Sequence, residues 1–104
     1  MIQKVNEKDR VQVDTGIISR MADEKKIKSV LHLARFCGCS WIVADKIMHD
    51  AIFATVTISM AMRISQAFKV SFKDILHINV HGNYTVIHGN NGYEIPKDRE
   101  FILE

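Results

Sequence analysis

Apolar side chains recur every three or four residues between residues 16 and 76, which is typical of amphipathic helices that bury one face. Each run follows a residue whose side-chain oxygen can accept from the free amides of a helix N-terminus. These candidate caps are Asp14 or Thr15, Ser29, Ser40, Thr57 and Ser71. The pattern therefore predicts five short helices, at residues 16–27, 30–37, 41–50, 58–68 and 72–76. Gly38 can end the second helix in the left-handed conformation.

The N-terminal residues follow another pattern. Val11 and Val13 flank a polar residue, so residues 11–13 predict a short strand. Residues 1–10 are charged and predict a loose arm. Residues 51–56, between the third and fourth helices, predict a connection that is unusually apolar.

The C-terminal residues predict a β-hairpin. Residues 83–88 and 92–95 are rich in β-forming side chains, and Asn91-Gly92 favours a tight turn because both residues tolerate positive φ. An isolated hairpin is marginally stable in water. We therefore expect it to pack on the helices, to add the 11–13 strand, or to pair with a second subunit. Residues 101–103 form an apolar patch in the remaining tail.

These elements predict a fold that is mainly α with a small β appendage, five helices followed by a hairpin. The chain of 104 residues suits one domain. Residues 1–15 form the arm with its short strand, residues 16–76 the helical part, and residues 77–104 the hairpin and tail, a candidate dimerisation element.

Charge is distributed unevenly along the chain. The net charge of +2 is too small to indicate nucleic-acid binding by itself. Residues 16–76, however, carry nine basic and five acidic side chains, while residues 77–104 carry two and four. A basic middle and an acidic end either suit different partners or reflect an ordinary solvated surface.

The sequence also predicts a cellular location. The N-terminus lacks the apolar segment of a signal peptide, and the longest charge-free apolar stretch, residues 51–62, is too short to span a bilayer. Cys37 and Cys39 are too close in sequence to suggest a structural disulfide. We expect a protein of the reducing cytoplasm, without membrane contact.

Catalytic and metal sites are not predicted. The sequence has no glycine-rich phosphate loop and no nucleophile and base at a catalytic spacing, so we expect neither an enzyme nor a cofactor. Cys37 and Cys39 with His32 suggest zinc only weakly, and small apolar core residues explain the cysteines better. His77, His81 and His88 either form a metal-binding or pH-sensitive cluster or lie separately at the surface, and the second interpretation is favoured.

Residues 17–76 resemble the Cro/lambda-repressor type of helix-turn-helix, the XRE family, without a gap. Leu33-Ala34 and Gly38-Cys39-Ser40 are similar to the family's "LA…GVS". Residues 40–50, SWIVADKIMHD, resemble its third helix, and residues 66–76, QAFKVSFKDIL, resemble its closing "KALGVSLDELL".

The resemblance implies that the third helix lies in the major groove while the second braces the DNA backbone. The side chains nearest the bases would be Ser40, Trp41, Ile42, Asp45, Lys46 and His49. The basic side chains that could meet phosphates are Lys25, Lys26, Lys28 and Arg35. A homodimer would match a palindromic site, and its candidate contact residues on the hairpin are Tyr84, Val86, Tyr93 and Ile95.

The third helix departs from a usual base-reading face. Such faces are rich in Arg, Lys, Asn and Gln, whereas this one offers Lys46 and His49 against Asp45 and Asp50. The apolar side chains Trp41, Ile52 and Phe53 either form a protein-binding patch or pack in the core.

The leading hypothesis is therefore a sequence-specific transcriptional regulator that binds double-stranded DNA, of the phage or prophage repressor type. The alternative is a protein-binding module built on the same fold, such as an antitoxin or a phage-encoded inhibitor.

Overall fold

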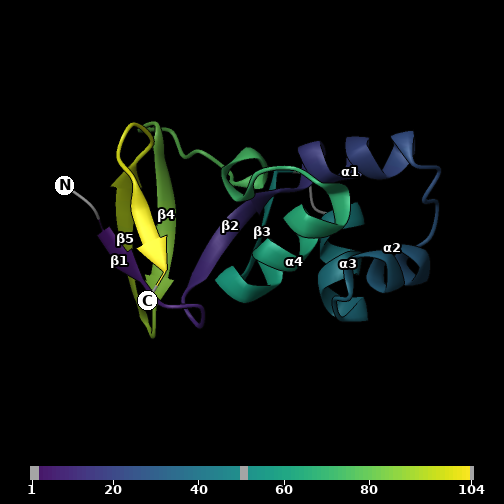
Figure 1. The fold of residues 1–104 in the computed structure, drawn as a ribbon, viewed down its shortest axis with the longest axis horizontal. Coiled ribbons are helices and arrows are strands. Elements are labelled where there is room, and N and C mark those ends of the chain that lie inside the picture. The colour runs from purple at the N-terminus through teal and green to yellow at the C-terminus, as the bar shows by residue number, and fades with distance from the viewer. Residues whose placement is uncertain (1–2, 50–51, 104) are drawn as a thin grey trace.

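The helices gather at one end of the molecule and most of the strands at the other (Figure 1). The computed structural model describes residues 3–49 and 52–103. Its extents are 40 × 24 × 23 Å. The long axis therefore runs from the helical end to the β end.

A four-stranded antiparallel sheet connects the two ends. Its strands, in spatial order, are β3 (Phe53–Thr57), β2 (Arg10–Asp14), β4 (Asn83–His88) and β5 (Asn91–Pro96). In the central strand β2, Val11 lies opposite both Val56 of β3 and Val86 of β4. All three valines are buried, and a register slip of one residue would turn them to solvent.

A second, two-stranded sheet lies at the β end. It pairs β1 (Gln3–Val5) in parallel with β6 (Phe101–Leu103). Val5 and Phe101 are buried, and the Phe101 ring meets Tyr84 of β4 edge-on at 6.1 Å between centroids. The two ends of the described chain are thus held together and packed against the larger sheet.

Three α-helices lie between β2 and β3. They are α1 (Thr15–Glu24), α2 (Val30–Cys37) and α3 (Trp41–His49). A fourth, α4 (Ile58–Phe68), follows β3 directly, and a 3-10 helix, η1 (Phe72–Ile75), comes next. Ile18, Leu33, Ile47 and Ile64, one from each α-helix, are fully buried and belong to one cluster, so all four α-helices share one core.

The predicted helix caps are found at the helix starts. The side chains of Asp14, Ser29 and Thr57 accept hydrogen bonds from the N–H groups of the residues three positions on. Ser40 does the same for α3, at 3.2 Å from the Val43 nitrogen. Each such cap stabilises its helix by about 1 kcal/mol.

The prediction of a mainly α fold with five α-helices was wrong. The described residues form four α-helices, one 3-10 helix and six strands. The predicted apolar connection contains β3, the predicted loose arm contains β1, and the predicted tail contains β6. The short strand at residues 11–13 is confirmed and extends over Arg10–Asp14.

The hairpin is confirmed, and it adds to the 11–13 strand, but its turn lies elsewhere than predicted. His88 pairs with Asn91, which leaves Gly89 and Asn90 as the turn, with Gly89 at a φ of 60°. This register pairs buried Tyr84 with buried Ile95. Burial of these side chains outweighs the local preference of Asn91-Gly92 for a turn.

A substitution at Gly38 tests whether the left-handed conformation at the end of α2 requires glycine. It has a φ of 66°, and a Cβ added there would meet no atom within 4 Å. Gly38→Ala should therefore cost about 1–2 kcal/mol of unfolding free energy through backbone strain alone. The control is Gly92→Ala, where φ is not in the left-handed region and the nearest atom is an ordinary 3.9 Å away. Urea unfolding that gave equal losses for both variants would contradict this reading.

Candidate nucleic-acid interface

The turn between α2 and α3 consists of residues 38–40. Gly38 ends α2 in the left-handed conformation, and the Cys39 N–H donates back to the Ala34 oxygen at 3.0 Å. Ser40 then caps α3. Ala44, on the first turn of α3, is fully buried and lets the two helices approach closely. This is the local arrangement that a helix-turn-helix requires.

Two side chains from other helices hold this turn in place. The Arg63 guanidinium of α4 donates to the Gly38 oxygen at 3.4 Å. The Ser19 hydroxyl of α1 donates to the Ile47 oxygen of α3 at 3.2 Å. The sequence reasoning did not single out either residue, because nothing in a local pattern shows which distant carbonyl a side chain reaches.

The predicted base-facing residues lie together on α3 and its cap. Trp41 and Ile42 expose 56% and 65% of their area. Ser40, Lys46 and His49 are also exposed, and Asp45 is half-buried. With Ala44 and Ile47 buried, α3 presents one face to solvent and the other to the core. A helix of nine residues is about 13.5 Å long, so the exposed face could span several base pairs.

The charges on this face are partly paired. His49 Nδ1 lies 3.0 Å from Asp45 Oδ1 and 3.0 Å from the Asp45 backbone oxygen. When His49 is protonated, the two side chains offset each other. Lys46 is the other basic side chain exposed on this face.

The predicted phosphate-contacting residues lie before α2 and on it. Lys25, Lys26 and Lys28 lie exposed between α1 and α2, and Arg35 lies exposed in the last turn of α2. Lys25 Nζ lies 6.0 Å from the centre of the Phe36 ring, and Lys28 Nζ lies 3.9 Å from Asp23. Lys28 directly precedes the Ser29 cap of α2, whose free amides and helix dipole also attract anions.

The residues of the alternative protein-binding patch come from the two ends of α3. Trp41 begins this helix, whereas Ile52 and Phe53 follow its C-terminal end in the chain. Both are exposed, and the Phe53 ring stacks on His77 at 5.0 Å. Ile52 and Phe53 line a separate cavity of about 480 Å³ with Val80.

The candidate dimerisation residues lie mostly inside the chain. Tyr84, Val86 and Ile95 are buried within this chain's own core. Tyr93 is half-buried, and its hydroxyl lies 3.5 Å from Asp9. These side chains therefore pack mostly within the chain itself.

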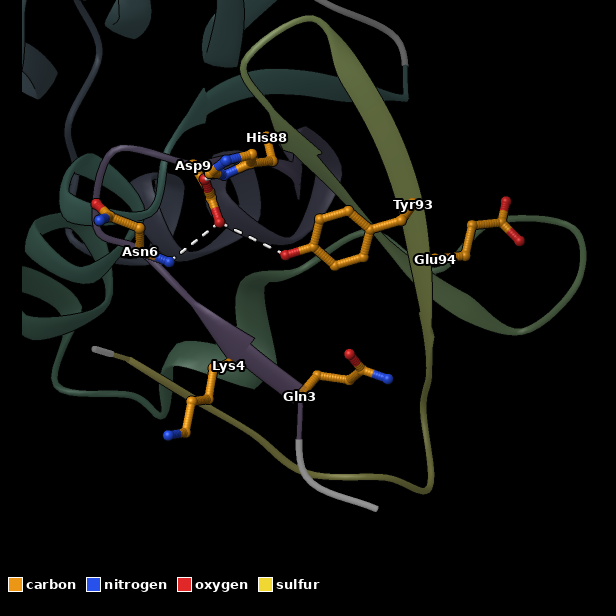
Figure 2. A pocket seen from close by; sticks show the side chains of 7 residues that line it. All are labelled: Gln3, Lys4, Asn6, Asp9, His88, Tyr93 and Glu94. Atoms are coloured by element: carbon orange, nitrogen blue, oxygen red, sulfur yellow. Dashed lines mark hydrogen bonds and ion pairs between the residues drawn. The ribbon is translucent and has the colours of Figure 1, made fainter.

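A second polar site lies at the β end, in a cavity of about 580 Å³. Figure 2 shows Asp9 beside His88, with the Tyr93 hydroxyl turned toward its carboxylate. Asp9 is almost fully buried and accepts from the Asn6 N–H at 3.0 Å, while His88 Nδ1 lies 2.6 Å from its other oxygen. The sequence reasoning missed Asp9, since it lies in a segment that was predicted to be loose.

These contacts determine the ionisation of Asp9. Burial by itself raises the pKa of its carboxyl group. The hydrogen bonds from Asn6, His88 and Tyr93 and the charge of His88 outweigh burial and hold the pKa below its ordinary value of 3.8. A charged Asp9 thus joins the β1–β2 turn to the hairpin. We interpret the cluster as a structural link, because all its bonds are internal.

The candidate histidine cluster concerns His77, His81 and His88. His77 stacks on Phe53, whereas His88 binds Asp9. Within residues 3–49 and 52–103, no group of three or more His, Cys, Asp or Glu side chains is placed to hold a metal ion. No helix in this described part is long and apolar enough to cross a membrane.

Comparison of the chain with protein-family models, with curated proteins and with solved structures gave no match.

Asp9→Asn should lower the unfolding free energy by about 1–3 kcal/mol at neutral pH, because a charged acceptor of buried hydrogen bonds is lost. The lowered pKa gives Asp9 a stabilising effect above pH 3.8, the ordinary value, that disappears as pH falls through the folded-state pKa. The difference between the two proteins should therefore shrink in acid. Urea unfolding from pH 7 to pH 2 measures it, with exposed Asp98→Asn as the control. A difference that did not change with pH would argue against a charged link.

Proposed function

We propose that this protein is a sequence-specific DNA-binding regulator of the repressor type, which inserts α3 into the major groove. The observation that supports the proposal most strongly is the capped three-residue turn between α2 and α3, followed by a helix with one face exposed to solvent. Such a helix fits the width of the major groove. The reducing cytoplasm is the compartment where such a regulator acts.

The α3 side chains could contact bases through both hydrogen bonds and apolar contacts. Lys46 can donate to guanine O6 and N7. Trp41 and Ile42 can contact thymine methyl groups, and Asp45 can accept from the cytosine amino group. The Asp45–His49 contact orients that carboxylate along the helix.

Phosphate contacts would come from the start of α2. The exposed lysines before Ser29, together with the amides at this helix end, form a basic region suited to one DNA strand. Few cations lie on α3 itself, so the salt dependence of binding should come mainly from the lysines before Ser29.

A homodimer remains part of the proposal, since two-fold symmetry doubles the base contacts. Because Tyr84, Val86 and Ile95 are occupied within one chain, the subunits would meet through other surfaces. The edge strands β3 and β5 of the four-stranded sheet are candidates.

Lys46→Ala should weaken binding to a duplex from upstream of the protein's own gene by about 1–3 kcal/mol, roughly 5- to 150-fold in Kd. Binding to an unrelated duplex should change much less. Anisotropy of labelled DNA across a salt series measures both. The matched control is Lys97→Ala, an exposed lysine at the β end. An unchanged affinity in Lys46→Ala, or an equal loss in Lys97→Ala, would remove Lys46 from the reading face.

A protein-binding module is the second candidate, and one observation favours it. Leu31 of α2 exposes 51% of its area, and Trp41 and Ile42 of α3 expose more than half of theirs. Exposed large apolar side chains on adjacent helices are typical of protein interfaces.

In that case the wild-type protein should capture a protein partner from lysate of the native cell even in about 1 M salt, which screens surface charges. Trp41→Ala should abolish this capture. Phe53→Ala would do so only if the partner also reaches the far end of α3. Ile102→Ala, an exposed apolar residue on β6, is the control. Retained capture by Trp41→Ala would count against this function.

A further inference from the structure

The turn of the helix-turn-helix contains the only two cysteines of the chain, on either side of Gly38. Cys37 is the last residue of α2 and is buried, whereas Cys39 is half-buried and accessible from the surface. Both side chains belong to or pack against the core. Sequence reasoning treated both cysteines as apolar packing residues, but their arrangement supports more than packing.

Several groups around Cys39 favour its thiolate. The Cys37 thiol donates a hydrogen bond to the Cys39 sulfur, which lowers the pKa of Cys39 to about 7 and raises that of Cys37. Its own backbone also lowers the pKa of Cys39, against the effect of burial. Cys39 also immediately precedes the cap of α3, at the positive end of that helix dipole. Thiolates are the reactive form of cysteine, and cations and helix N-termini promote them.

We propose that Cys39 is a site of reversible oxidation by peroxides, with Cys37 as the thiol that resolves the oxidised form. The Cys39 thiolate attacks one peroxide oxygen, the O–O bond breaks, and hydroxide leaves and takes up a proton as water. The Cys39 sulfenic acid is then attacked by the Cys37 sulfur. The S–O bond breaks, the S–S bond forms, and the proton of Cys37 leaves with hydroxide as a second water. The two sulfurs lose two electrons together, and the peroxide gains them.

A disulfide across one residue would change the shape of the turn. It would draw Cys37 out of the core and disturb the left-handed Gly38, which is free of close contacts and can adjust. The Cys39–Ala34 and Arg63–Gly38 hydrogen bonds would have to break or move. Strained disulfides of this kind are easily reduced, so thiol reductants would restore the turn. If α3 reads DNA as proposed above, oxidation would release the DNA; the oxidation site itself does not depend on that function.

To test this, the folded, reduced protein is treated with hydrogen peroxide, and its intact mass is measured with and without dimedone, which traps sulfenic acid. The wild-type protein should lose two hydrogens and regain them with dithiothreitol. Cys37→Ala, which keeps a small apolar side chain in the core, should accumulate the dimedone adduct at Cys39. Cys39→Ser should give no adduct at Cys37. Fluorescence of Trp41, the single tryptophan and two residues from Cys39, should change on oxidation of the wild-type protein and recover on reduction.

A second measurement covers the case in which a cysteine variant fails to fold. The rate of iodoacetamide alkylation at Cys39 of the wild-type protein should rise with a midpoint near pH 7, compared with about 8.5 for an ordinary cysteine. Oxidation that begins at Cys37, or Cys39 alkylation with an ordinary midpoint and no intramolecular disulfide, would overturn the proposal. None of these readouts uses DNA, so failure here and failure of DNA binding can be told apart.

Discussion

The antiparallel pairing of β2 with β3 closes the chain around its first three helices. Asp14, at the end of β2, pairs with Phe53, at the start of β3, so α1, α2 and α3 leave and return at one point of the sheet. The same residues also serve the helices, since Asp14 caps α1 and Thr57, the last residue of β3, caps α4. Strand pairing and helix starts therefore constrain each other. A change in register would move the caps as well as the buried valines.

Within this frame, the α2–α3 turn receives support from both sides. Arg63 holds its carbonyl from α4, and Ser19 holds α3 from α1. A rigid scaffold of this kind can present α3 without using the residues of its outer face for folding. Those residues are consequently available for binding, and they include an exposed tryptophan and isoleucine beside a lysine. The placement of both thiols in the turn makes its geometry sensitive to chemistry as well as to packing.

The sequence predicts the helices well because their caps and periodicity are local signals. Ser29, Gly38, Ser40 and Thr57 each do what their residue type suggests. The six residues predicted to face the bases also lie on or beside one helix, although their contact with DNA stays a prediction.

The strands β1 and β6 could not be predicted, because three residues at each end of the chain pair only with each other and carry no long pattern. In strand β3, Ala54 and Val56 are buried on either side of Thr55. Because Ala54 is small, this two-residue alternation is hard to distinguish in the sequence from a uniformly apolar run. Asp9 and Arg63 act through partners far along the chain, which local patterns do not reveal.

The central claim is that α3 enters the major groove, and amide chemical shifts test it most directly. Isotope-labelled protein would be titrated at low salt with a duplex from upstream of its gene, and the perturbed amides would be mapped onto the structure. Binding through α3 predicts changes concentrated in residues 25–31 and 35–49, with the four-stranded sheet nearly unaffected. Changes confined to β4 and β5, or no changes at all even at low salt, would contradict DNA reading by α3 and leave the exposed faces of α2 and α3 as a surface for proteins.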